Sequence, residues 1–310
     1  MAYATRHLSC ALHHSYRELG NPAQAVIGDL SIMAPQMYFS GLNRPPFFEI
    51  LARQQAAGML NALSAREPAV LRACREYPSV LLTMDSGAFQ GNRDLEGYVR
   101  CIQQLFHRLQ WYTTLDVVHN QQATDANYKI LSRMLTEEQA AKLLYVYQAQ
   151  SCGSHWCRAG DLEALRRAAD QHRFLGIGGL VSVLNRNLQE AMDLLAAIGE
   201  VLISTNTEAH LLGAGNYSLL AAFSSARWFR SADSARWLQG LSSGLLLTCD
   251  GRSLNAHRLR LALTGMQCAE QNLRATLSWL QPGRVHQLAL FPDVEEENEL
   301  LPPLRAEHSA

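Results

Sequence analysis

Lysine is almost absent from this sequence, which carries its positive charge on arginine. Only Lys129 and Lys142 are lysines among the 27 basic residues, and the formal net charge is -1. A chain so close to neutral has no general attraction for nucleic acid. Electrostatic binding of a polyanion would therefore depend on a local cluster of arginines.

Long hydrophobic runs are also missing. No stretch approaches the roughly 20 apolar residues that a membrane-spanning helix needs, and residues 1–15 carry Arg6, His7, His13 and His14 where a secretory signal has an apolar block. We therefore expect a cytoplasmic protein without a membrane segment. With 310 residues, 48% of them hydrophobic, the chain is long enough to bury a large core.

The seven cysteines predict neither a disulfide framework nor a metal site. Their number is odd and their positions are scattered, which is typical of free thiols in a reducing compartment. Cys152 and Cys157 are separated by four residues, and no second pair lies within reach, so a zinc site is not predicted there. We expect no metal and no cofactor.

Short apolar segments alternate with segments of helical spacing along most of the chain. Turn residues bound the apolar segments, which is typical of strands. Between them apolar residues recur three or four positions apart, as in the expected helix 48–65. The expected strands are 31–39, 80–83, 112–118, 143–147, 174–177, 209–212, 228–232 and 245–248.

Eight strands separated by helices predict an α/β fold of the (β/α)8 type, the TIM barrel. A doubly wound sheet is the alternative, but no Gly-x-Gly-x-x-Gly follows the first strand, and the glycines of segment 176–179 come late and lack that spacing. We expect one barrel domain over residues 1–290. The tail 291–310 is acidic and contains prolines, and we expect it to be disordered.

Polar residues and glycines collect where the expected strands end. Because the chemistry of a parallel barrel takes place at the carboxyl ends of its strands, these residues are expected to converge. Asp85, followed by Ser86 and Gly87, would equally suit the N-cap of a helix, which is the structural alternative for that residue. The residues at the expected strand ends are Asp85, Asp116, Gln148, Gly178, Gly179, Gly213, Gly215 and Asp233.

Three aspartates at the ends of different strands suit a displacement at a sugar carbon. One carboxylate attacks, another transfers protons, and nearby negative charge stabilises an oxocarbenium-like centre. Gln148 both donates and accepts hydrogen bonds, which fits the edge of a purine. Aspartates at barrel mouths also bind metals and sugars in unrelated enzymes, so these residues alone indicate sugar or nucleoside chemistry and no more.

Several of these motifs resemble, in order along the chain, those of the tRNA-guanine transglycosylases, barrel enzymes that exchange guanine for a 7-deazaguanine. The segment 85–90, Asp-Ser-Gly-Ala-Phe-Gln, resembles the family signature Asp-Ser-Gly-Gly-Phe-Gln. Leu115-Asp116 falls where the family has a base-recognising aspartate. Further similarities cover Val146-Tyr-Gln148-Ala, the glycine-rich segment 176–180, the segment 210–215 (His-Leu-Leu-Gly-Ala-Gly) and the segment 229–237 around Asp233.

This resemblance implies a double displacement. Asp233 attacks C1′ of the target nucleotide and expels guanine, and Asp85 then deprotonates the incoming base, which displaces the enzyme. Asp116, Gln148, Gly179 and Leu180 read the base edge. Phe89 and Leu212 stack on the faces of the base, with plain core packing as the alternative for both. The residues expected to bind substrate are Ser86, Phe89, Asp116, Gln148, Gly178, Gly179, Leu180, His210, Leu212 and Gly213.

The departures from the family concern the polymer that is modified. Ala88 stands where the signature has its second glycine. The family's zinc motif, Cys-x-Cys-x-x-Cys with a later histidine, is absent, since only Cys268 lies beyond Asp250. The chain is more similar to the zinc-free branch that inserts 7-deazaguanines into DNA. We therefore expect no zinc subdomain, DNA rather than tRNA as the polymer, and a 7-deazaguanine base as the second substrate.

Six arginines lie between residues 227 and 260, against Asp233 and Asp250. We expect this stretch to meet phosphates near Asp233, and ordinary solvated surface is the alternative. The expected nucleic-acid contacts are Arg227, Arg230, Arg236 and Arg252.

Three other functions stay open from the sequence: exchange in tRNA, hydrolysis of an N-glycoside, and nucleic-acid binding without catalysis. A partner protein that supplies DNA contacts or opens the strand is compatible with so neutral a chain.

Overall fold

Nine parallel strands form one sheet in the part of the chain that the structure describes. The computed structural model describes residues 34–149 and 159–280, which belong to one compact unit. The strand order is β5-β4-β3-β2-β1-β9-β8-β7-β6, so the last strand of the sheet, β9, lies beside the first. The strands are β1 (Gln36–Ser40), β2 (Ala57–Asn61), β3 (Leu82–Asp85), β4 (Leu109–Thr113), β5 (Leu143–Leu144), β6 (Val146–Gln148), β7 (Phe174–Gly178), β8 (Glu208–Leu211) and β9 (Phe229–Ser234).

The sheet closes on itself through the segment 143–148. β5 pairs with β4, β6 pairs with β7, and only Tyr145 lies between β5 and β6. The carbonyl oxygen of Tyr145 accepts a hydrogen bond from the N–H of Gly176 in β7 (2.8 Å), so one segment bridges both edges of the sheet. When β5 and β6 are taken as one interrupted strand, the nine strands occupy eight positions. The chain is therefore a (β/α)8 barrel.

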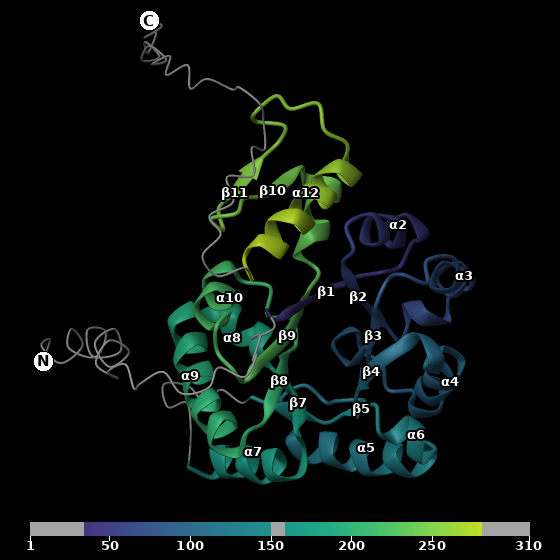
Figure 1. Ribbon diagram of the computed structural model, residues 1–310, viewed down its shortest axis with the longest axis vertical. Coiled ribbons are helices and arrows are strands. Elements are labelled where there is room, and N and C mark those ends of the chain that lie inside the picture. Colours follow the sequence, from purple (N-terminus) through teal and green to yellow (C-terminus); the bar gives the residue numbers. More distant parts are fainter. Residues whose placement is uncertain (1–33, 150–158, 281–310) are drawn as a thin grey trace, which may run out of the picture. The chain divides into compact units, whose positions relative to one another are not determined.

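Helices surround the ring of strands and connect one strand to the next (Figure 1). Side-chain caps fix where several of them begin. Asp94 accepts a hydrogen bond from the N–H of Gly97 (2.8 Å) at the start of α4, and Asn120 accepts one from Ala123 (3.0 Å) at the start of α5. The helices are α2 (Pro45–Arg53), α3 (Pro68–Glu76), α4 (Leu95–Leu105), α5 (Gln121–Met134), α6 (Glu137–Ala140), α7 (Ala159–Gln171), α8 (Leu180–Arg186), α9 (Leu188–Thr205), α10 (Tyr217–Phe223), α11 (Gly240–Ser243) and α12 (Gly265–Ser278).

Two apolar clusters lie on opposite faces of the barrel sheet. The larger one fills the space between strands and helices and includes Phe39 of β1. Neighbouring residues of a strand point to opposite faces, so Tyr38 faces the inside of the barrel. There a smaller cluster forms, and it consists of Tyr38, Ala57, Met59, Trp111 and Leu144, with Phe174 and Leu212 packed against it.

Two expected segments differ from the structure in type or in their place in the fold. Ala57–Asn61 is strand β2, although it falls within the helix 48–65 that the spacing predicts, and α2 already ends at Arg53. Because β2 is buried along nearly its whole length, its apolar run shows no alternation, and periodicity cannot separate it from a buried helix. The expected last strand, 245–248, lies outside the barrel.

That segment, β10 (Leu245–Leu247), pairs in antiparallel fashion with β11 (Ser253–Asn255) and packs near α12 (Figure 1). We call β10, β11 and α12 the small lobe. Asn272 of α12 joins the helix to β10, because its side chain accepts a hydrogen bond from the N–H of Leu247 (2.6 Å) and donates one to the carbonyl oxygen of Leu245 (2.9 Å). Within residues 34–149 and 159–280, no cluster of three or more histidine, cysteine or acidic side chains is placed to hold a metal ion.

No helix in the described segments is long and apolar enough to cross a membrane. Cys152, Cys157 and the expected tail 291–310 lie outside the described residues.

Candidate active site at the carboxyl ends of the strands

Three aspartates meet at the carboxyl end of the barrel. Asp85 is the last residue of β3, Asp233 is the next-to-last residue of β9, and Asp116 lies in the loop that follows β4. The expected strand 112–118 begins and ends earlier, as β4, which is why Asp116 is a loop residue. The negative charges of Asp116 and Asp233 both raise the pKa of Asp85, so the three carboxyl groups share one electrostatic site.

The pKa of the Asp85 carboxyl group is strongly raised. Loss of hydration on burial is the largest cause, and together with the two neighbouring charges it raises the pKa of Asp85 from 3.8 to about 7. Hydrogen bonds from the N–H groups of Gly87 and Ser86 act in the opposite direction and lower the pKa. The Gly87 bond, to Oδ2, measures 3.0 Å and closes a short turn. Asp85 caps no helix there, because the next α-helix, α4, is capped by Asp94. Asp85 is therefore suited to proton transfer near neutral pH.

Asp116 is held by two side chains, one on each oxygen. The hydroxyl of Ser86 donates to Oδ1 (2.8 Å), and the amide of Gln148 donates to Oδ2 (2.7 Å). Burial raises the pKa of Asp116, and these two hydrogen bonds act in the opposite direction. The amide oxygen of Gln148 accepts a hydrogen bond from the N–H of His119 (3.3 Å). Both ends of the Gln148 amide are thus engaged, and its observed role is to orient Asp116.

Asp233 is held through one oxygen only. Oδ1 accepts a hydrogen bond from the N–H of Gly213 (2.7 Å) and lies 3.3 Å from Nε2 of His210. Oδ2 has no hydrogen-bond partner among the described residues, and this atom is not fully buried. Oδ2 is therefore the oxygen that a substrate can reach.

The predicted glycines of the site are required for packing. A Cβ atom on Gly178 would lie 2.6 Å from Nε2 of Gln148, so a side chain there would displace the residue that orients Asp116. Gly179 has a φ of +77°, and its Cβ would lie 2.4 Å from the carbonyl oxygen of Ala149. A Cβ on Gly213 would lie 2.5 Å from Val181. Their backbone groups remain candidates for contact with a base.

The three predicted apolar contacts separate clearly by exposure. Phe89 lies in the 3-10 turn that ends the 85–90 motif and is 71% exposed, so core packing does not explain it. Leu212 is half-buried and packs against the cluster inside the barrel. Leu180 is fully buried at the start of α8 and belongs to the core. Only Phe89 is thus fully available to a ligand.

The four predicted arginine contacts lie in three different places. Arg236 follows β9 directly, donates to the carbonyl oxygen of Gly215 (3.3 Å), and is half-buried near the site. Arg252 lies in the β10–β11 lobe, where it pairs with Asp250 (2.7 Å). Arg230 is the second residue of β9 and lies about 10 Å back along the strand from Asp233, and Arg227 lies in the turn before the amino end of β9. The expectation that these two surround Asp233 does not hold.

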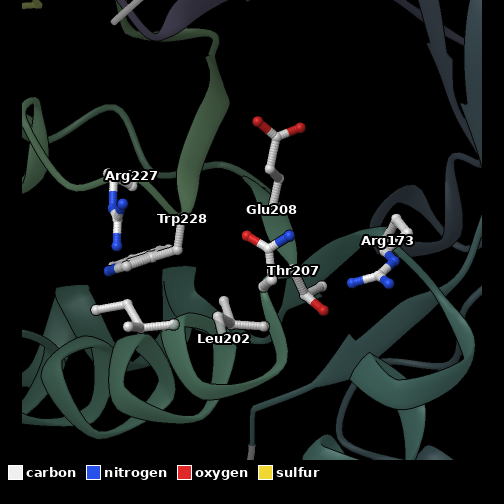
Figure 2. A pocket seen from close by; sticks show the side chains of 8 residues that line it. Arg173, Leu202, Thr207, Glu208, Arg227 and Trp228 are labelled. Atoms are coloured by element: carbon white, nitrogen blue, oxygen red, sulfur yellow. The ribbon is translucent and has the colours of Figure 1, made fainter. Parts of the chain in front are cut away.

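Arg227 instead lines a pocket of about 320 Å³ at the amino ends of β8 and β9. Figure 2 shows Arg227 beside Trp228 on one side, Arg173 on the other, and Thr207 and Glu208 between them. Glu208 pairs with Arg230 (2.9 Å). This pocket lies at the opposite end of the barrel from the three aspartates and is not part of the candidate active site.

Sequence reasoning missed two residues of the site. Arg93 donates hydrogen bonds to the carbonyl oxygens of Ala88 (3.3 Å) and Asn92 (2.9 Å), and its charge lowers the pKa of Asp116. Ser231 contacts the ring of His210, with Oγ 2.9 Å from Nδ1. Ser231 is two positions before Asp233 on one strand, and that spacing alone places both on the same face.

Ser231, His210 and Asp233 form a serine–histidine–aspartate chain, but not that of a serine hydrolase. Ser231 is 2% exposed and lies deeper in the barrel, whereas Asp233 is nearer the carboxyl end. A nucleophilic serine must reach its substrate, and the aspartate of such a triad lies behind the histidine. The order here is reversed, so that Asp233, and not Ser231, lies at the carboxyl end of the barrel.

The fold and site define a class: a (β/α)8 barrel with three interacting aspartates at the carboxyl ends of its strands. No protein-family model matches the sequence, and no curated protein does either. Among solved structures, a protein described as a fructose-1,6-biphosphate aldolase, from Coccidioides immitis, has 11% identity and a TM-score of 0.45 over 80% of this chain and 90% of its own. A dipeptide epimerase from Methylococcus capsulatus has 13% identity and a TM-score of 0.41 over 72% and 62%. These similarities carry no argument about activity.

Proposed function

We propose that this protein is a base-exchange enzyme that replaces guanine in DNA with a 7-deazaguanine through a covalent intermediate on Asp233. The observation that carries the proposal is the contrast between two neighbouring aspartates. Asp85 holds a proton up to about pH 7, and Asp233 presents one free oxygen while the other is held by donors. Two carboxyl groups in such different environments suit separate roles as proton carrier and nucleophile.

In the first half of the reaction, Oδ2 of Asp233 attacks C1′ of the target nucleotide. The bond between C1′ and the base nitrogen breaks, its electron pair leaves with guanine, and the protonated carboxyl of Asp85 supplies a proton to the departing base. In the second half, Asp85, now ionised, takes a proton from the incoming 7-deazaguanine. The deprotonated nitrogen attacks C1′, the bond to Asp233 breaks, and both aspartates return to their starting states.

We propose DNA rather than tRNA as the polymer because of the sequence after the barrel. The zinc motif of the tRNA enzymes is absent there, and the remaining Cys268 is buried in the small lobe against Leu246 and Ala256. Arg93 and Arg236 supply positive charge near the aspartates for the phosphates beside a target nucleotide. A paired guanine would have to leave the duplex before C1′ can react.

The test is to incubate the protein with labelled guanine-containing DNA or tRNA and with 7-cyano- or 7-aminomethyl-7-deazaguanine. We expect guanine release coupled to incorporation of the 7-deazaguanine into DNA. Incorporation into tRNA alone would reverse the choice of polymer. Guanine release without incorporation would indicate an N-glycoside hydrolase, and no release from either polymer would refute the proposal.

Replacing Phe89 with alanine should affect exchange but not folding. Because the ring is 71% exposed, we expect the free energy of unfolding to change by no more than about 0.5 kcal/mol. Loss of a stacking surface for the base should lower the exchange rate at limiting base about tenfold. Urea denaturation and exchange kinetics measure the two effects.

The matched control is Leu81→Ala. Leu81 is 50% exposed and precedes β3, so it lies at the end of the strand away from Asp85. Exchange by this variant should equal that of the unaltered protein. Equal exchange rates for Phe89→Ala and Leu81→Ala would remove Phe89 from the site.

A further inference from the structure

We infer that His210 is a positioning residue that locks Oδ1 of Asp233 and thereby selects Oδ2 as the attacking atom. The resemblance places His210 among the residues that bind the base, but its contacts give it a different task. The inference rests on the proposed role of Asp233 and adds the way in which its carboxylate is oriented.

The His210 ring is enclosed on all sides inside the barrel. It has no exposed surface, and it makes edge-to-face contacts with Trp111 (4.7 Å between ring centres) and Tyr38 (5.9 Å). In the pairing of β8 with β9, His210 lies opposite Ser231. A ring packed between two aromatic side chains has no room to turn toward a base, so its two nitrogens keep their present partners.

The two partners determine which nitrogen carries the proton. Nε2 lies 3.3 Å from the Asp233 carboxylate, and Nδ1 lies 2.9 Å from Oγ of Ser231. A carboxylate only accepts hydrogen bonds, whereas a hydroxyl can donate. The satisfied arrangement therefore places the proton on Nε2, which donates to Asp233, while Nδ1 accepts from the hydroxyl of Ser231.

Two donors on one oxygen fix the rotation of the Asp233 carboxylate. The Gly213 N–H belongs to the backbone and cannot swing away, and His210, three residues earlier in β8, supplies a second donor. With Oδ1 occupied twice, Oδ2 is directed to the substrate side before any substrate binds. A nucleophile held in its attacking orientation gains rate because that orientation does not have to be found during the reaction.

The first experiment compares His210→Phe, which keeps a ring of similar shape, with His210→Gln, which keeps an N–H donor. We expect His210→Phe to slow single-turnover guanine release about 100-fold without raising KM for the free base. His210→Gln should recover a large part of that loss. A higher KM for the base with an unchanged rate of guanine release would instead return His210 to base binding and overturn the inference.

The second experiment needs no activity and no altered histidine. In the NMR spectrum of protein labelled with ¹⁵N-histidine, His210 should carry its proton on Nε2, and Asp233→Asn should shift that resonance. A proton on Nδ1 only, or a resonance that Asp233→Asn leaves in place, would overturn the inference. If the protein exchanges no base while the NMR result holds, the proposed function fails and the positioning contact stands, so the two failures are distinguishable.

Discussion

Replacing Asp233 with asparagine should abolish the covalent intermediate and lower base exchange by about 10⁴-fold or more. Asparagine has nearly the same shape, and its side-chain oxygen can still accept the hydrogen bond from Gly213, so the strand ends should keep their structure. It lacks the second carboxylate oxygen that attacks C1′. The measurement is a denaturing gel of protein mixed with labelled DNA in the absence of a free base, where a covalent adduct moves with the protein.

Asp250→Asn is the matched control for this result. Asp250 is the other aspartate of the arginine-rich stretch, but it is exposed and paired with Arg252 (2.7 Å) in the small lobe. We expect its adduct to form as in the unaltered protein. An adduct that persists in Asp233→Asn and disappears in Asp250→Asn would place the nucleophile at Asp250.

Replacing Asp85 with asparagine should have the second largest effect on exchange. An amide cannot supply a proton to the departing guanine or take one from the incoming base, and we expect a loss of about 10²- to 10⁴-fold. Because the pKa of Asp85 is raised to about 7, exchange by the unaltered protein should be fastest near pH 7, where both protonation states are available. Exchange rates between pH 5 and 9 should show this maximum, and Asp85→Asn should remove it.

Asp116→Asn tests the cause of that pH maximum. The charge of Asp116 raises the pKa of Asp85, so its removal should move the maximum to lower pH. Asparagine can still accept from Ser86 or Gln148, which limits the structural change. An unchanged maximum in Asp116→Asn, or in Asp85→Asn itself, would assign the pH dependence to another group.

The same carboxyl group should make the fold less stable as pH rises. The pKa of Asp85 is about 7 in the folded protein and near 3.8 when it is exposed to water. Between about pH 4 and pH 7 the unfolded chain loses this proton and the folded chain keeps it, so the free energy of unfolding falls with rising pH. The loss is at most about 4 kcal/mol, and less where water reaches the half-buried carboxyl. The difference in the free energy of unfolding between pH 5 and pH 8, measured by urea denaturation, should be smaller for Asp85→Asn than for the unaltered protein.

The positions of Asp85 and Asp233 could be predicted from the sequence because each comes at the end of a short expected strand. A buried parallel strand followed abruptly by polar residues indicates the carboxyl end of a barrel strand, and the structure places both residues there. Strand β2 could not be recognised, since Ala57–Asn61 is a continuous apolar run that follows helix α2 after a turn of only three residues.

The contacts within the site depend on register, which no local pattern specifies. His210 meets Ser231 because β8 and β9 pair with a shift between Ala209 and His210. Arg227 and Arg230 are close to Asp233 in sequence but not in space, because a strand is extended and carries the residues before Asp233 away from it. Arg227 and Arg230 lie before the carboxyl end of β9, whereas Arg236 follows it directly.

The candidate active site is complete only after the barrel has closed. Asp85 and Asp116 lie in the part of the chain from β1 to β6, and Asp233 lies in the part from β7 to β9. In the sheet, these two parts are joined only where β1 pairs with β9 and β6 with β7. The first of these pairings sets Asp233 opposite Tyr38, which is 195 positions earlier in the chain (233 − 38), and such distant contacts form slowly during folding. On the proposed mechanism, an incompletely folded chain keeps its nucleophile apart from its proton carrier and cannot cut a glycosidic bond in DNA.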